Sequence, residues 1–199
     1  MKKLLITGFD PFGGATVNPS REAVMALPDR IGDWMLTKLE VPTVFGQAAD
    51  RVLTLARELT PDAIICVGQA GGRAAVTPEV VAINLREAAI PDNAGNQPQN
   101  TPVVEGGPAA YFATLPVRDM VAAIKAADLP ATLSYTAGAF VCNDLLYTLL
   151  HAYRESEVRV GFIHIPYLPE QAKEGAPSLP AESVVKALTA AILALDHSA

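Results

Sequence analysis

The sequence lacks the features that mark nucleic-acid-binding, disulfide-rich and metal-binding proteins. Charged residues make up 18% of the 199 residues, and a net charge of −6 argues against the basic face of a nucleic-acid binder. Two cysteines, Cys66 and Cys142, provide neither a disulfide framework nor metal-ligand spacing. The three histidines, His151, His164 and His197, form no ligand pair. We therefore expect a cytoplasmic, metal-free protein.

Long hydrophobic runs are also missing. The start of the chain, Met1 to Ile6, resembles the beginning of a signal peptide, but the apolar run ends at Gly8 without a small-residue cleavage site. It is too short for a signal peptide or a membrane span, so we interpret it as a first buried strand. Hydrophobic residues nevertheless make up 50% of the chain, which allows both a sizeable core and an apolar surface for self-association. We expect one domain over residues 1–199.

Short apolar runs alternate with helical patterns along the chain. This alternation predicts an α/β fold, a single-domain three-layer α/β/α sandwich with a largely parallel twisted sheet. Reactive groups in such sheets gather at the carboxyl ends of strands, where the loops GFDPFGG and GQAGG and the segment HIPY fall. A long surface loop with a short strand at 103–104 is expected at 91–107. The expected strands are 3–7, 35–41, 63–67, 80–85, 132–135 and 159–165, and the expected helices are 19–27 (capped by Asn18 or Ser20), 47–59, 117–127, 141–153 and 181–195.

Cys142 lies in the segment TAGAFVCND, at the expected start of a helix. A thiol there faces unpaired backbone N–H groups and the positive end of the helix dipole, which together favour the thiolate. The small residues 137–139 before it leave room for a substrate backbone. The alternative is a small buried hydrophobe, which is what we expect for Cys66 inside the apolar run 63–67.

His164 ends the apolar strand of the segment FIHIPY and is the best-placed histidine to pair with a cysteine nucleophile. The alternative for His164 is a core histidine with satisfied hydrogen bonds. His151 falls inside a helix and His197 lies near the end of the chain, so neither competes well. A third residue should accept the other imidazole N–H, and Glu79 is the candidate. Local sequence alone favours an exposed strand-end carboxylate for Glu79.

Several separate blocks, in the same order along the chain, are similar to the type I pyroglutamyl peptidase (pyrrolidone-carboxylate peptidase) family of cysteine peptidases. The resemblance runs from Leu5 to about Gln171, through TGFDPFGG with VNPS, EVPTVFG, VGQAGGR, PEVVAINL, IPDNAGNQP, TAGAFVCN and FIHIPYLPEQ. It implies that Cys142 is the nucleophile, His164 the base and Glu79 its partner. It also implies a homotetramer that removes the N-terminal pyroglutamyl residue from peptides, without cofactor or metal.

The substrate implied by this resemblance is a neutral five-membered lactam with two apolar methylenes. A pocket for it needs flat apolar walls and a few exact polar partners. Aromatic residues would supply the walls and Gln69 would hydrogen-bond the lactam, whereas plain core packing is the alternative for Phe9 and Phe12. We therefore expect a pocket lined by Phe9, Phe12, Thr43, Gln69, Ile90, Phe140 and Val141.

The chain departs from the family pattern at Val80, where relatives usually have Arg or Lys, and at Ala89, where they usually have Arg. The resemblance implies that the family's arginine acts near the reacting carbonyl. Its absence leaves the oxyanion to the N–H of Cys142 and neighbouring donors, and loss of one donor typically costs about 10²–10³ in rate. Arg73 and Arg86 are candidate replacements.

The sequence leaves two alternative functions open. The first is a catalytically weak relative that binds a lactam or a nucleoside-like ligand, against which the intact cysteine, histidine and glutamate argue. The second is a nucleoside phosphorylase-type transferase. That reaction needs a cationic phosphate site, and GFDPFGG contains no Lys or Arg.

Overall fold

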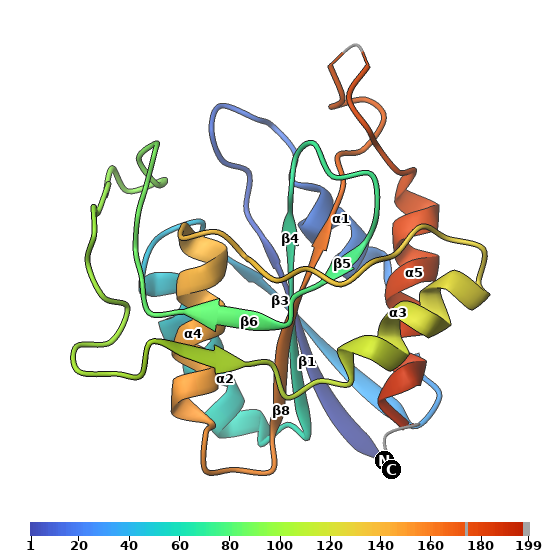
Figure 1. The fold of residues 1–199 in the computed structure, drawn as a ribbon. Coiled ribbons are helices and arrows are strands. Elements are labelled where there is room, and N and C mark those ends of the chain that lie inside the picture. The colour runs from blue at the N-terminus through green and yellow to red at the C-terminus, as the bar shows by residue number, and fades with distance from the viewer. Residues whose placement is uncertain (174, 197–199) are drawn as a thin grey trace.

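A computed structural model describes residues 1–173 and 175–196, and its centre is a six-stranded sheet in the order β2-β3-β1-β4-β8-β5 (Figure 1). The four inner strands run parallel to one another, and the two short edge strands, β2 and β5, are antiparallel to their neighbours. This mixed but largely parallel sheet confirms the α/β fold class. The strands are β1 (Lys2–Phe9), β2 (Arg30–Ile31), β3 (Trp34–Val41), β4 (Ala63–Gln69), β5 (Thr77–Pro78) and β8 (Arg159–Ile165).

Helices cover both faces of this sheet (Figure 1). On one face lie α1 (Pro19–Ala26), α3 (Val117–Ala126) and α5 (Ala181–Leu193), which a short 3-10 helix, Ala194–Asp196, follows. On the other face lie α2 (Gln47–Leu59) and α4 (Val141–Ala152). The five helices agree with the predicted ones to within two residues at each end. The cap of α1 is Asn18, whose side chain accepts the N–H of Ser20.

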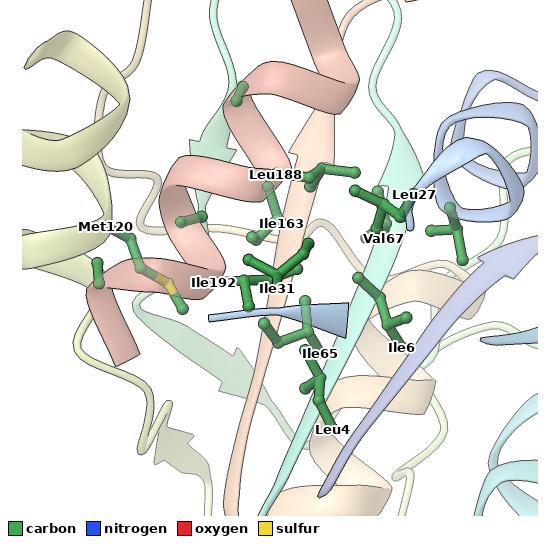
Figure 2. Packing of buried hydrophobic residues seen from close by; sticks show 14 of the residues in the cluster. Leu4, Ile6, Leu27, Ile31, Ile65, Val67, Met120, Ile163, Leu188 and Ile192 are labelled. Carbon is green, nitrogen blue, oxygen red and sulfur yellow. The ribbon is translucent and has the colours of Figure 1, made fainter. Parts of the chain in front are cut away.

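The core has two apolar layers because successive side chains of a strand point to opposite faces of the sheet. Leu4 and Ile6 of β1 face the layer under α1, α3 and α5, together with Ile65 of β4, and Figure 2 shows them in one cluster with Leu188 and Ile192 of α5. Leu5 of β1 faces the layer under α2 and α4. The three-layer arrangement follows from these two cores.

Two predicted strands are not in the central sheet. The run at 80–85 forms β6 (Val81–Ile83), which pairs with β7 (Ala110–Phe112) in a separate antiparallel sheet. The run at 132–135 makes only isolated bridges, from Ala131 to Val76 and from Ser134 to Glu79. Pro78 lies between those bridges on β5 and has no N–H to donate, so the ladder is broken there. The expected strand at 103–104 is a bend in a loop.

Within the described residues, no helix combines the length and apolar character needed to cross a membrane. In the same part of the chain, no group of three or more His, Cys, Asp or Glu side chains has the arrangement of a metal site. His197, one of the histidines considered above, lies outside the described residues.

Candidate active site

Cys142 is the second residue of α4, where the helix begins beside the carboxyl ends of β4 and β8. Phe140 precedes the helix in an extended conformation and supplies no side-chain cap. The backbone N–H groups of the first turn have no carbonyl partner inside a helix, so they are free to bind an oxygen that develops negative charge. Cys142 therefore has the placement expected from its sequence.

Two side chains immediately after Cys142 fix the first turn of α4. The amide of Asn143 accepts the N–H of Ile83 at 2.9 Å and donates to the carbonyls of Ile83 and Leu85 at 2.9 and 3.0 Å. One oxygen of the fully buried Asp144 accepts from Arg86 Nε at 2.6 Å, and the other accepts a backbone N–H at 2.8 Å. The sequence identified both as first-turn residues but gave no sign of these partners, which come from the segment around β6 and the start of α2.

His164 is buried near the end of β8, and its Nδ1 lies 2.7 Å from Oε1 of Glu79. Because an ionised carboxylate only accepts hydrogen bonds, Nδ1 carries the proton in this contact and Nε2 is left to accept one. The two residues come together because β5 pairs antiparallel with β8, with Thr77 opposite His164. The N–H of Glu79 also donates to the carbonyl of Phe162 at 2.9 Å. Glu79 is thus 0% exposed, in contrast to the exposed carboxylate that local sequence favoured.

A cation joins this pair. Arg73 Nη1 donates to the same Oε1 of Glu79 at 2.7 Å and to Oγ1 of Thr77 at 2.6 Å, and Nη2 donates to the carbonyl of Thr136 at 3.0 Å. The second carboxylate oxygen of Glu79 is buried and has no hydrogen-bond partner among the described residues. Of the two arginines considered as replacements, Arg73 lines the cavity of Cys142, and Arg86 is bound to Asp144 instead.

Burial sets the protonation of the cysteine and the histidine. It raises the pKa of the Cys142 thiol to about 12, with the negative charge of Glu79 and the neighbouring Cys66 acting in the same direction against Arg73. Burial also lowers the pKa of His164, which Glu79 opposes. Both groups are therefore neutral at neutral pH. The pKa of Cys142 thus departs in the direction opposite to the one expected from the helix terminus alone, because loss of solvation is its largest cause.

Cys142, His164 and Arg73 line one cavity of about 340 Å³. No hydrogen bond joins the thiol to the imidazole among the described residues. The rest of the wall is largely aromatic or small, and Phe12 and Phe140 lie with their ring centroids 6.4 Å apart. The expected pocket residues that line this cavity are Phe9, Phe12, Thr43, Gln69 and Phe140. Arg73 is the one charged side chain in the described lining, and it is already bound to Glu79.

The other two expected pocket residues lie elsewhere. Ile90 is 48% exposed and lines a neighbouring cavity of about 720 Å³, which shares Phe12 and Gln69 with the first. The side chain of Val141 is fully buried against the core under α2 and α4, since the first turn of α4 directs it inward. Ala89 is exposed and does not line the cavity of Cys142. Residues that were not expected in the pocket also line the cavity of Cys142, among them Asn18 and Thr136.

A free cysteine at a helix N-terminus and, on the same cavity, a histidine bound to a buried glutamate form the arrangement of a cysteine hydrolase on an α/β sheet. The family model described as pyroglutamyl peptidase matches residues 2–197, and the chain belongs to this family. It is therefore a peptidase, and the family predicted from the sequence is confirmed.

Individual relatives agree with this assignment. The chain is 52% identical to a pyrrolidone-carboxylate peptidase of Cupriavidus necator over 96% of this chain and 92% of the relative. A crystal structure of Bacillus amyloliquefaciens pyroglutamyl peptidase I superposes with a TM-score of 0.95 at 49% identity, over 100% of this chain and 98% of that one. The pyrrolidone carboxyl peptidase of Thermococcus litoralis superposes with a TM-score of 0.94 at 35% identity, over 99% and 94%.

Proposed function

We propose that this chain removes the N-terminal pyroglutamyl residue from peptides by acyl transfer through Cys142. One observation carries the proposal: Cys142 and His164, whose imidazole is bound to Glu79, line a single cavity whose remaining wall is largely aromatic or small. The lining offers no uncompensated charge, which suits a neutral lactam better than a charged N-terminal amine.

The reaction begins with a neutral thiol and a neutral imidazole. When the substrate carbonyl is in place, Nε2 of His164 takes the thiol proton and the sulfur of Cys142 attacks the carbonyl carbon. The carbonyl oxygen becomes an oxyanion, which the free N–H groups at the start of α4 stabilise. Glu79 keeps Nδ1 protonated and stabilises the positive charge that forms on the ring.

The tetrahedral intermediate then collapses. Its electrons return to the carbonyl, the bond to the leaving nitrogen breaks, and His164 donates its proton to that nitrogen. A thioester between pyroglutamate and Cys142 remains. Water enters, His164 removes its proton, and hydrolysis of the thioester releases pyroglutamate and restores the thiol.

The lactam ring would lie against the aromatic walls. Phe9 is 2% exposed and forms the closed side, whereas Phe12 and Phe140 are partly exposed at the mouth. Gln69, at the end of β4, would supply an amide hydrogen bond to the lactam, and Thr43 a further polar contact. This arrangement recognises the ring carbonyl and N–H rather than charge.

The proposal extends to the setting of the enzyme. A one-domain cytoplasmic protein is consistent with its two free thiols, since disulfides are rare in that compartment. A homotetramer is proposed on the family resemblance, and the exposed aromatic side chains of Phe112 and Tyr135 offer apolar surface for self-association. Light scattering of the purified chain measures the mass of the assembly directly.

The test of the proposed function is hydrolysis of a chromogenic pyroglutamyl amide by the purified protein. We expect turnover by the wild type, loss of turnover in Cys142→Ser, and retained turnover in Cys66→Ser, which removes the other thiol. A wild-type protein without activity on pyroglutamyl amides would reject the proposal. Equal activity in Cys142→Ser would reject the nucleophile.

A further inference from the structure

We propose that Arg73 is a positioning residue that holds the Glu79 carboxylate in the orientation in which it serves His164. This inference rests on the proposed function and concerns the same site. Its basis is that Arg73 and His164 bind one and the same oxygen of Glu79, at 2.7 Å each, inside a fully buried environment.

Few contacts fix the orientation of the Glu79 carboxylate. Oε2 has no partner among the described residues, so all the side-chain hydrogen bonds of Glu79 converge on Oε1. With the imidazole as its sole partner, the carboxylate could turn and exchange its two oxygens. Arg73 prevents this rotation because its own guanidinium is fixed by Thr77 and by the carbonyl of Thr136.

Those two anchors belong to the parts of the chain that the catalytic residues occupy. Thr77 is on β5, opposite His164 on β8. Thr136 begins the turn that leads to Cys142 at the start of α4. A planar guanidinium with several donors in a fixed fork can hold three such acceptors at once, which a lysine ammonium on its flexible stem does less well. Arg73 therefore links the elements that carry the base, its partner and the nucleophile.

The charge of Arg73 has a second effect. A buried carboxylate without a compensating cation is costly, and Arg73 supplies that cation. The same positive charge disfavours a proton on His164, so the pKa of His164 is lowered by burial and by Arg73 together, against Glu79. The thiol of Cys142 lines the same cavity as the ring, and Cys66 is a neighbour of Cys142. His164 thus stays neutral and ready to accept the thiol proton.

The chain contains a matched control. Arg86 and Arg73 are both 27% exposed, and each is paired with a carboxylate that is 0% exposed, Asp144 and Glu79 respectively. The two side chains therefore have similar surroundings, and removal of either guanidinium should lower the free energy of unfolding by a similar amount. They differ in that Arg86 does not touch the His164–Glu79 pair.

The experiment compares Arg73→Gln, Arg73→Lys and Arg86→Gln by kcat, KM and the pH dependence of kcat/KM on a chromogenic pyroglutamyl amide. Arg73→Gln should lower kcat by roughly 10–10²-fold with little change in KM, since misplacement of a catalytic group by about 1 Å can cost 10²-fold. The acid limb of kcat/KM should move to higher pH, because loss of the cation raises the pKa of His164. Arg73→Lys keeps the charge, so it should return the acid limb to its wild-type position with a partial recovery of kcat. Arg86→Gln should leave the acid limb in place.

Three results would overturn the inference while the proposed function stands, provided the wild type hydrolyses the substrate. They are an unchanged kcat in Arg73→Gln, a rise in KM without loss of kcat, which indicates direct substrate contact, and an acid limb that stays in place or moves to lower pH. If Arg73→Gln does not fold, as judged by circular dichroism, Arg73→Lys is the deciding variant. A wild-type kcat in Arg73→Lys would overturn the positioning role. A lowered kcat, with KM and the position of the acid limb unchanged, would support it.

Discussion

Gly68 and Cys142 are in such close approach that a β-carbon on Gly68 would lie 3.1 Å from Sγ of Cys142. The same β-carbon would lie 2.7 Å from the ring of Phe162. Gly68 is opposite His164 in the pairing of β4 with β8, so the missing side chain is at the centre of the site. Without it, the first turn of α4 can pack against the carboxyl ends of both strands, and the thiol reaches the cavity of His164.

Gly68→Ala should therefore harm stability and activity together. Forcing a methyl group into a well-packed site typically costs about 1–3 kcal/mol, and here the strain falls on the nucleophile. We expect a lower free energy of unfolding in urea and a reduced kcat. Gly161→Ala is the control, because its β-carbon would clash with Leu115 in the opposite core layer. It should lose stability but keep kcat, and the same result for Gly68→Ala would contradict this description of the site.

Alkylation by iodoacetamide should distinguish the two thiols. Cys66 is 0% exposed and its pKa is raised by burial to about 12, so it should stay unmodified in the native protein. Cys142 lines the cavity and should be alkylated with loss of activity. Because burial also raises the pKa of Cys142 to about 12, its reaction at neutral pH depends on His164 as a base.

His164→Ala should accordingly slow the alkylation of Cys142 at neutral pH, and the rate in this variant should climb as the pH rises toward the thiol pKa. Mass spectrometry of peptides carrying each cysteine measures both rates. Equal labelling of Cys66 and Cys142 would show that both thiols are accessible in the native protein, which contradicts the prediction. An unchanged rate in His164→Ala would mean that the imidazole is not the base.

Removal of the base and of its partner should differ in severity. His164→Ala loses both the acid and the base role, and we expect kcat to fall by about 10²–10⁴-fold. Glu79→Gln should lower kcat less, since the imidazole remains but loses orientation and charge stabilisation. Steady-state kinetics on the chromogenic amide measures both. Wild-type kcat in Glu79→Gln would reduce that residue to a structural role.

The proposed hydrogen bond to the lactam predicts a strong preference for pyroglutamyl over prolyl substrates. A site that hydrogen-bonds a polar group can reject an analogue lacking it by about 10⁴-fold, because its own buried polar groups are left unpaired. Prolyl amides lack the ring carbonyl and should be hydrolysed that much more slowly by kcat/KM. Phe12→Ala should raise KM for the pyroglutamyl amide with a smaller effect on kcat. Comparable cleavage of the two amides would refute the assignment of substrate.

The sequence predicted the elements whose apolar pattern is strong and local. The run at 63–67 and the helix at 47–59 needed no tertiary information, because their periodicity is that of a buried strand and an amphipathic helix. The strand expected at 132–135 was wrong because Pro78, far away in the chain, removes the N–H that the ladder needs. A pattern in one segment contains no information about its pairing partner.

The candidate site shows the same limit. The positions of Cys142 and His164 at the ends of secondary-structure elements could be predicted from local signals. The burial of Glu79 could not, because it depends on the pairing of β5 with β8 and on the cation of Arg73. The protonation of Cys142 could not be predicted from the sequence either, because the burial that raises the pKa of its thiol depends on tertiary contacts.

The central claim is that catalysis proceeds through a thioester at Cys142. Rapid quenching of the enzyme with a chromogenic pyroglutamyl amide, followed by mass spectrometry of its peptides, tests this most directly. We predict a pyroglutamyl adduct on the peptide that carries Cys142, formed with a burst of released amine when hydrolysis of the thioester is the slow step. Hydroxylamine should trap the acyl group from the wild type, and Cys142→Ser should not turn over. An adduct on another residue, or continued turnover in Cys142→Ala, would contradict the mechanism.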